Sequence, residues 1–263
     1  MGDRRRRPAG VDTTVIVCAD RQVIAARAVD LLVDALRMAI ARRGEAHLAL
    51  TGGSSATALY GQLCGSERSR RVDWSRMHIW QGDERFVPST DPLSNWSAAR
   101  REWLDHPDGP AIPAHHLHPM PVDEAIDAGH DAAWAAERYT AELERLLPRV
   151  RDLPALDVIL LGVGSDGHIL STFPGTAPIS EERQAAMAVE APTHVEPHVA
   201  RVTLAPHLLR AAGLVIVMVP GAAKAGIIAR CLGSMRDPDR WPAQLAVRAN
   251  AVWLLEPGSA ARL

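Results

Sequence analysis

Hydrophobic positions follow two patterns that alternate along the chain. Short apolar runs are typical of buried strands, whereas apolar residues that recur every three or four positions are typical of a helix with one buried face. Strands are predicted at residues 13–18, 46–50, 77–80, 158–161, 201–204, 214–219 and 252–255. Helices are predicted at residues 22–42, 56–63, 94–104, 127–147 and 221–232, with a short one between the strands at 201–204 and 214–219.

This order of elements predicts an α/β fold. Strands that are separated by helices form largely parallel sheets with helices on both faces. We therefore expect three layers, with a Rossmann-like, mainly parallel sheet in the middle. Residues 105–126 are rich in Pro, His and Asp and are expected to form a loop. Because the sequence has no internal repeat and no low-complexity linker, residues 13–263 are interpreted as a single domain.

Composition and charge exclude several classes of protein. Hydrophobic residues make up 47% of the 263 residues, which is enough for a large core. The formal net charge of −2 provides no basic field for binding nucleic acid. The arginines at positions 4–7 precede Pro8 and Gly10, so residues 1–12 are interpreted as a disordered basic tail rather than a nucleic-acid or membrane contact.

The apolar runs and the cysteines predict a location in the cell. The runs are too short to span a bilayer, and no apolar segment of a secretory signal follows the arginines. Cys18, Cys64 and Cys231 are widely spaced and odd in number, which favours reduced thiols. We therefore expect a cytoplasmic protein without membrane contact.

Three predicted strands end in loops that carry candidate functional residues, and in open α/β sheets such strand ends hold the ligand. After the strand at 46–50, Gly52, Gly53 and Ser54 would present backbone N–H groups at a helix start, which is typical of an anion site. An ordinary turn with a serine cap is the alternative. The loop lacks the nucleotide P-loop and GxGxxG patterns, which favours a sugar phosphate over a nucleotide.

The loop after the strand at 77–80 contains Asp83 and Arg85. A guanidinium group matches the geometry of a phosphate, and a carboxylate accepts hydrogen bonds from sugar hydroxyls or from water. The alternative is a surface cluster in which these charges pair with one another.

The loop after the strand at 158–161 contains two glycines, Asp166 and His168. Histidine takes up a proton near neutral pH, so His168 is a candidate general base that either Asp166 or Asp83, across the cleft, could orient. A histidine that only packs or caps is the alternative. Lys224, near the start of the helix at 221–232, is a candidate phosphate ligand or a surface lysine.

Two other features are interpreted without a chemical role. His115, His116 and His118 lack the cysteine or carboxylate spacing of a metal site, so we expect loop histidines and no metal. Ser171 is a poor candidate nucleophile because the chain has no Gly-x-Ser-x-Gly elbow.

Taken in order, these motifs resemble those of the 6-phosphogluconolactonase family, from about Val15 to the C-terminus. The loop at 162–168 is also similar to that of glucosamine-6-phosphate deaminases. Those enzymes usually continue with Asn-Glu-Pro and carry Asp-Glu-Tyr at the position of Arg85, whereas this chain has Thr172-Phe173-Pro174 and an arginine, which favours the lactonases. The segments that carry the resemblance are 51–54, 83–88, 94–95, 162–168, 171, 173–174, 201–204, 221, 224–225 and 253–255.

The resemblance implies a sugar-phosphate isomerase-like fold without a cofactor. It implies hydrolysis of 6-phospho-D-glucono-1,5-lactone to 6-phospho-D-gluconate in the oxidative pentose phosphate pathway, with the sugar phosphate lactone as the ligand. His168 then corresponds to the general base and Arg85 to a phosphate ligand. The other residues expected to bind the substrate are Gly52, Gly53, Ser54, Asp83, Arg201 and Lys224. We expect a monomer or a small homo-oligomer.

The chain departs from the family at one position that concerns binding. Many relatives carry Lys-Pro-Pro shortly before the strand that matches 201–204, but residues 192–198 contain no lysine here. Either one phosphate cation is missing here, or His194 or His198 replaces it, and His194 is taken as a candidate substrate ligand. Two other functions stay open: a glucosamine-6-phosphate deaminase or isomerase, and a non-catalytic sugar-phosphate sensor, although the chain has no room for the second domain that such sensors carry.

Overall fold

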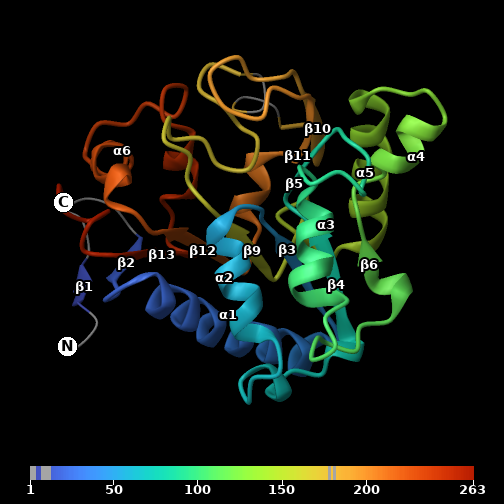
Figure 1. The fold of residues 1–263 in the computed structure, drawn as a ribbon, viewed down its shortest axis with the longest axis horizontal. Helices are drawn as coiled ribbons and strands as arrows, with labels where there is room; N and C mark the ends of the chain where they lie inside the picture. Colours follow the sequence, from blue (N-terminus) through green and yellow to red (C-terminus); the bar gives the residue numbers. More distant parts are fainter. Residues whose placement is uncertain (1–3, 7–12, 177–178, 180–181) are drawn as a thin grey trace.

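The computed structural model describes residues 4–6, 13–176, 179 and 182–263 (Figure 1). The strands are β1 (Arg4–Arg6), β2 (Thr14–Val17), β3 (Ala46–Leu50), β4 (Met77–Gln81), β5 (Asp83–Arg85), β6 (Leu117–His118), β7 (Arg149–Val150), β8 (Leu153–Pro154), β9 (Val158–Leu161), β10 (Ala186–Val189), β11 (Arg201–Leu204), β12 (Leu214–Val219) and β13 (Ala251–Leu255). The α-helices are α1 (Arg21–Arg43), α2 (Ser54–Leu63), α3 (Asn95–Ala99), α4 (Val122–Asp127), α5 (Ala132–Leu146) and α6 (Ala225–Cys231). Short 3-10 helices include Ala114–His116, Pro206–Arg210, Ala222–Lys224 and Pro242–Ala246, and a π-helical turn, Arg100–Leu104, continues α3.

A mainly parallel sheet forms the middle of the molecule. Its strand order over the described residues is β1-β2-β13-β12-β9-β3-β4-β6. Every neighbouring pair is parallel except β1 and β2, which are antiparallel. The carboxyl ends of the parallel strands therefore meet at one edge of the sheet, where the loops with the candidate residues begin.

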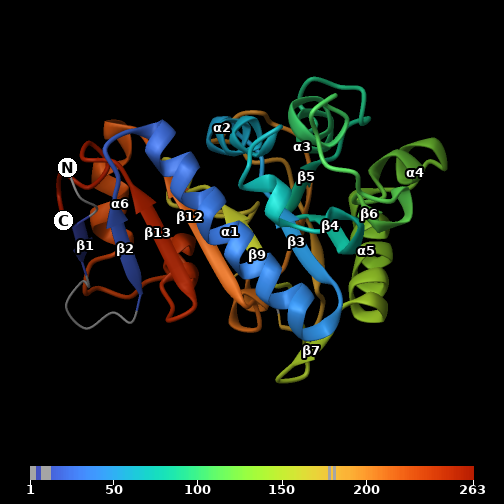
Figure 2. The same cartoon turned by 90° about the horizontal axis from the view of Figure 1, so that it is seen from below.

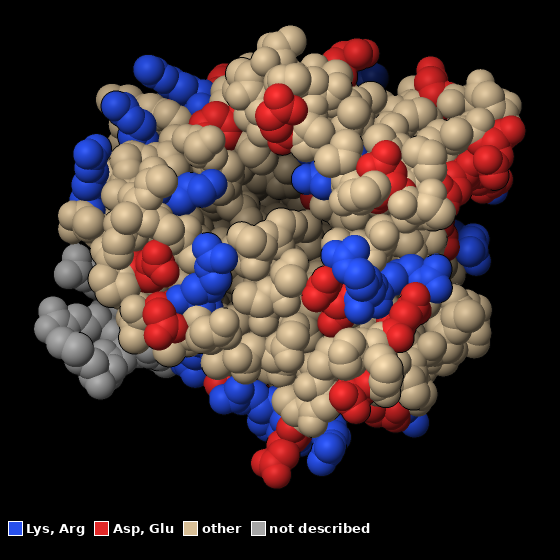
Figure 3. Space-filling model, viewed as in Figure 1, with Lys and Arg blue, Asp and Glu red and all other residues tan. Residues whose placement is uncertain are grey.

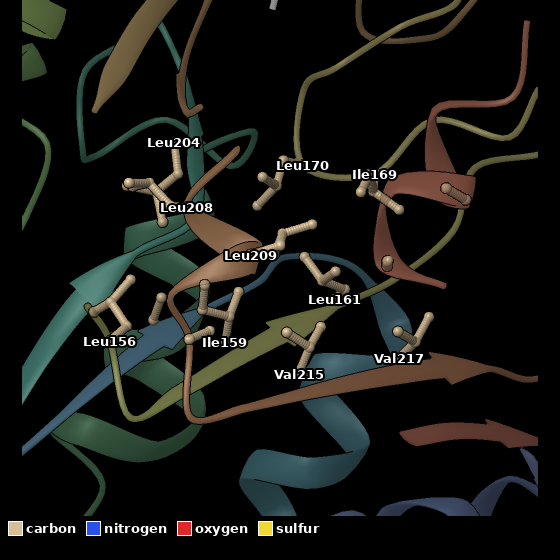
Figure 4. Close-up of a cluster of buried hydrophobic side chains, with 14 of the residues drawn as sticks. Leu156, Ile159, Leu161, Ile169, Leu170, Leu204, Leu208, Leu209, Val215 and Val217 are labelled. Atoms are coloured by element: carbon tan, nitrogen blue, oxygen red, sulfur yellow. The ribbon is translucent and has the colours of Figure 1, made fainter. Parts of the chain in front are cut away.

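Helices cover both faces of this sheet, because alternate residues of its central strands enter different cores. In β9, Val158 and Leu160 pack with α1, α2 and α3, whereas Ile159 and Leu161 pack with α5, α6 and β11. Figure 4 shows Ile159 and Leu161 beside Val215 from β12 in the second of these cores. Figure 2 shows α1 lying across one face of the sheet and α5 beside β6, at the end of the strand order. These layers confirm the predicted three-layer α/β fold.

The strand predicted at 201–204 forms, but outside the main sheet. It is β11, the middle strand of a small antiparallel sheet with the order β10-β11-β5. The chain reaches this sheet at Gly82, where an added Cβ would lie 2.7 Å from the carbonyl oxygen of Leu50. Only glycine allows this close approach of the two backbones, so β5 leaves the plane of β4 immediately.

Two segments between β5 and β7 differ from the prediction. The expected loop at 105–126 contains β6 and the start of α4. The helix predicted from residue 127 begins only at Ala132, because Gly129 has a φ of +71° and Asp131 caps α5 by accepting a hydrogen bond from the backbone N–H of Trp134.

The N-terminal segment differs from the expected disordered tail where it is described. Arg4–Arg6 form β1 and pair with β2, while the rest of residues 1–12 lies outside the described residues. Within the described ranges, no helix is both long and apolar enough to cross a lipid bilayer.

Candidate active site

A cavity of about 440 Å³ opens at the carboxyl edge of the parallel sheet. Figure 3 shows it as a hollow in one face of the molecule, with Lys or Arg side chains on two sides. The loops that follow β3, β4, β9 and β12 surround it, together with the start of α1 and of β11. The predicted site residues that line it are Gly52, Gly53, Ser54, Asp83, Arg85, His168, Arg201 and Lys224.

The loop between β3 and α2 brings a helix N-terminus to the cavity. Gly53 precedes the first residue of α2 and has a φ of +85°, so no side chain caps the helix. The alternative of a serine cap does not hold, because Ser54 is the first residue of the helix. Because Gly53, Ser54 and Ser55 line the cavity, the positive end of the α2 dipole lies beside it. An added Cβ at Gly52 would lie 2.0 Å from the side-chain oxygen of Asn95, so any other residue there would displace the Asn95 side chain.

Asp83 and Arg85 flank a buried carboxylate that shapes their loop. Glu84 accepts hydrogen bonds from the backbone N–H groups of Asn95 and Trp96 at 2.7 and 2.8 Å, so it caps α3. Burial raises the pKa of Glu84, and these hydrogen bonds oppose the rise. On either side of it, Asp83 accepts a hydrogen bond from the Ser171 hydroxyl at 2.8 Å, and Arg85 borders the cavity.

Arg85 and Arg201 are cross-strand neighbours in the small sheet. Arg201 is 3% exposed, and it donates a hydrogen bond to the carbonyl oxygen of Pro197 and lies over the ring of Phe173. Burial lowers the pKa of Arg201, and the neighbouring charge of Arg85 lowers it further while Asp83 opposes the change. The buried Nε of Arg85 has no hydrogen-bond partner in the described part of the chain. Two guanidinium groups on one wall are typical of a site for a doubly charged phosphate.

His168 and Asp166 form a short hydrogen-bonded pair on the loop after β9. The Nδ1 of His168 lies 2.6 Å from Asp166 Oδ1, which also accepts the backbone N–H of His168. Burial opposes ionisation of Asp166, but its hydrogen bonds with His168 and His194 hold its pKa well below the ordinary value. An ionised Asp166 can only accept a hydrogen bond, so the proton of the neutral imidazole lies on Nδ1 and the lone pair on Nε2.

Asp166 and His194 stand behind His168 instead of lining the cavity. The Nε2 of His194 lies 3.0 Å from Asp166 Oδ2, and neither residue borders the hollow. His198 is also elsewhere, because its ring contacts the carbonyl oxygen of Pro192 and the carboxylate of Glu196. The structure thus places His194 as a partner of Asp166, not in the cavity position that we expected for a substrate ligand.

Lys224 reaches the cavity from the short 3-10 helix that follows β12. Its Nζ donates a hydrogen bond to the carbonyl oxygen of Val163 in the loop after β9. Burial lowers the pKa of Lys224, and the charge of Asp166 opposes this change. The cavity therefore has a cation beside the His168 loop as well as the two arginines on the small sheet.

Arg21 and Asn95 are among the further lining residues that the sequence analysis did not identify as site residues. Arg21 is the first residue of α1, and Asn95 is the first residue of α3. The signal for Arg21 was its place shortly after β2, since a parallel strand ends at the same edge as the others.

Ser171, which we excluded as a nucleophile, is fully buried and hydrogen-bonded to Asp83. Among the described residues, no group of His, Cys, Asp and Glu has the geometry of a metal site.

Comparisons with known proteins agree on one family. The model of the family described as glucosamine-6-phosphate isomerases/6-phosphogluconolactonase matches residues 19–254. A 6-phosphogluconolactonase of Mycobacterium tuberculosis is 35% identical over 254 residues, which cover 96% of this chain and 99% of that protein.

Solved structures are similar over nearly the whole chain. The 6-phosphogluconolactonase of Trypanosoma brucei superposes with a TM-score of 0.83 and 27% identity, over 97% of this chain and 100% of the other. A monomeric glucosamine-6-phosphate deaminase has a TM-score of 0.77 at 18% identity, over 95% of this chain and 99% of the other. That second similarity shows the fold alone.

Proposed function

The chain belongs to the glucosamine-6-phosphate isomerase/6-phosphogluconolactonase family, and we propose that it hydrolyses 6-phospho-D-glucono-1,5-lactone to 6-phospho-D-gluconate, in the oxidative pentose phosphate pathway. The observation that carries this proposal is that His168, Arg85 and Arg201 line the same cavity. A base and two phosphate ligands in one cavity suit a substrate with a reactive ester carbon and a remote phosphate.

His168 acts as the base that activates water. With Nδ1 bonded to Asp166 at 2.6 Å, Nε2 accepts a proton from water as the oxygen attacks C1 of the lactone. A bond forms between this oxygen and C1, and the bond from C1 to the ring oxygen then breaks. His168 returns the proton to the departing ring oxygen. General acid–base help of this kind contributes about 10²- to 10⁴-fold to a rate.

Asp166 is a positioning residue in this scheme. It fixes the imidazole tautomer, and it stabilises the imidazolium ion that forms when His168 has taken the proton. His194 holds the other carboxylate oxygen of Asp166, so the carboxylate has a fixed orientation. The sequence of contacts from His194 through Asp166 to His168 sets the direction of Nε2.

The phosphate end of the cavity positions the substrate. Arg85 and Arg201 bind phosphate oxygens, while the N-terminus of α2 and Lys224 add positive potential nearby. Binding energy from this remote group orients C1 against the water and His168. Backbone N–H groups of the glycine loops stabilise the oxyanion at C1, at about 2.7–4 kcal/mol for each donor.

The test is hydrolysis of freshly prepared lactone by the wild type, His168→Ala and a control, His130→Ala. His130 is exposed and stacks on Trp134. It is distant in sequence from every residue that lines the cavity. After subtraction of spontaneous ring opening, we expect kcat to fall by at least about 10²-fold for His168→Ala and to stay unchanged for the control. The His168→Ala variant should still bind 6-phosphogluconate. An unchanged rate would refute the base role.

The same protein distinguishes the second activity of the family. Ammonia release from glucosamine 6-phosphate, measured alongside lactone hydrolysis, is expected to be absent. Release at a rate comparable with lactone hydrolysis would support the deaminase instead. Product binding without turnover of either substrate would support a sensor.

A further inference from the structure

A second, larger cavity lies at the opposite edge of the parallel sheet. It has a volume of about 600 Å³, and Gly213 and Asn250, which line it, directly precede β12 and β13. The candidate active site is bordered instead by Met218 and Val219 at the far end of β12. Six residues of strand separate the two cavities, a distance of roughly 20 Å.

Four arginines line this second cavity, and no acidic residue does. They come from separate parts of the chain: the end of α1, the turn between β7 and β8, the end of a 3-10 helix and the segment before β13. Figure 2 shows β7 projecting beyond the end of α1. We call these four residues the arginine cluster: Arg42, Arg151, Arg210 and Arg248.

Most of the arginine cluster has no counter-charge. Within the described ranges, the guanidinium groups of Arg42, Arg151 and Arg248 form no hydrogen bond and no ion pair. Only Arg210 has an acidic partner, Glu182, at 2.6 Å. Burial lowers the pKa of Arg248, and the like charges of Arg210 and Arg151 lower it further. Such a group of cations repels itself, so an anion bound among them would stabilise the fold.

Ordinary explanations account for only part of the cluster. Arg42 lies in the last turn of α1, where a positive charge interacts favourably with the helix dipole. Arg151 stands instead on a tight turn, where it and Asp152 have φ values of +50° and +63°. Arg248 lies in the turn before β13, where its backbone carbonyl oxygen accepts a hydrogen bond from Ala251. Neither place calls for an arginine.

We infer that this cavity binds a small anion that carries two or more linked phosphate groups. Guanidinium groups bind phosphate oxygens in pairs, and a cavity of about 600 Å³ lined by four of them has room for more than one phosphate group. Val150, which is 45% exposed, and Val247 add an apolar wall that a nucleoside could contact. The site is independent of the proposed hydrolysis.

The test is calorimetric titration of the whole protein at low salt with tripolyphosphate, ADP, inorganic phosphate and adenosine. Saturating 6-phosphogluconate is present, so that the candidate active site is occupied. We expect tripolyphosphate or ADP to bind with a Kd below about 1 mM and at least tenfold more tightly than phosphate. Tighter binding of ADP would identify the ligand as a nucleotide, and tighter binding of tripolyphosphate as an inorganic polyphosphate.

Variants locate the binding. Arg151→Gln, on an exposed turn, and Arg248→Gln should each weaken binding by at least threefold, and the double variant by at least tenfold. Arg145→Gln, an exposed arginine on α5, is the matched control and should bind as the wild type does. The inference fails if neither tripolyphosphate nor ADP binds, if phosphate binds equally well, or if Arg151→Gln binds unchanged.

Discussion

A Cβ atom on Gly164 would lie 2.0 Å from Nδ1 of His168 and 2.5 Å from Oδ1 of Asp166. The hydrogen bond between these two side chains therefore occupies the space that any other residue at 164 would need. The backbone N–H of Gly164 also donates to the carbonyl oxygen of His168 at 2.8 Å. The absence of a side chain at 164 is thus a condition for the orientation of His168.

We predict that Gly164→Ala lowers kcat for lactone hydrolysis by about 10²-fold, because a displacement of about 1 Å in a catalytic group has an effect of that size. KM should change little, since the atoms nearest to the added Cβ belong to His168 and Asp166 and not to the phosphate ligands. The measurement is steady-state hydrolysis with the spontaneous rate subtracted. Gly61→Ala is the control, because nothing lies within 4 Å of an added Cβ there. Equal activity of both variants would contradict the steric argument.

Asp166→Asn should lower kcat by about 10²- to 10⁴-fold while the protein stays folded. The new amide can donate to Nδ1 and so favours the tautomer whose Nε2 carries the proton, which cannot accept one from water. Titration with 6-phosphogluconate should give an unchanged Kd, because Asp166 does not line the cavity. A variant that loses binding and turnover together would show that Asp166 acts on the substrate site and not on the tautomer.

Arg85→Ala should raise KM by roughly 10- to 100-fold, since a hydrogen bond to a charged group contributes about 1.5–3 kcal/mol. The effect on kcat should be smaller if Arg85 only holds the phosphate. Arg100→Ala removes an exposed ion pair with Asp105 at 2.6 Å, which contributes about 0–1 kcal/mol to stability, and should leave KM as it is. A KM for Arg85→Ala close to that of this control would remove Arg85 from the phosphate site.

The stability of the fold should fall in mild acid because of histidines at the amino ends of β3 and β4. Burial lowers the pKa of His47, His116 and His78, the last to about 3, with neighbouring histidines adding to the effect on His78. The Nδ1 of His78 lies 2.9 Å from Nε2 of His118, whose Nδ1 contacts Glu142, and Glu45 faces His47 and His78.

The direction of this dependence follows from the lowered pKa values. The unfolded chain binds these protons below about pH 6.5, whereas the folded protein binds them only at lower pH, which for His78 is near its lowered pKa of about 3. The free energy of unfolding is therefore largest above pH 6.5 and should fall by up to about 1.4 kcal/mol per pH unit for each such histidine. Urea unfolding at pH 7 and 5 measures it. His78→Asn should flatten the decline, and an equal decline in the variant would exclude His78 as a cause.

The sequence predicted most of the central sheet, because buried parallel strands are continuous apolar runs. The strands at 46–50, 158–161 and 214–219 have the predicted bounds. It did not predict β6, which has only two residues, Leu117–His118, and depends on pairing with β4. Nor could the sequence at 201–204 indicate which sheet this strand joins, since its partners come from distant segments of the chain.

The candidate site could be predicted where a side chain lies in the segment that follows a parallel strand. Asp83 and Arg85 follow β4, His168 follows β9, and all three line one cavity. His194 lies in a long irregular segment, so its place against Asp166 depends on tertiary packing that no local pattern records. For Arg21, the position after β2 could be predicted from the sequence. Its role could not, because a single arginine at the start of a helix belongs to no motif.

The division of β9 between two cores has a consequence for how this protein can change. Insertion of one residue in the middle of that strand would turn the residues beyond it, Leu160 and Leu161, to the opposite faces, and both layers of helices would lose their fit at once. The loops beyond the strand ends carry no such constraint. New specificities in this scaffold should therefore arise by lengthening and rewriting those loops, while the strand lengths stay fixed.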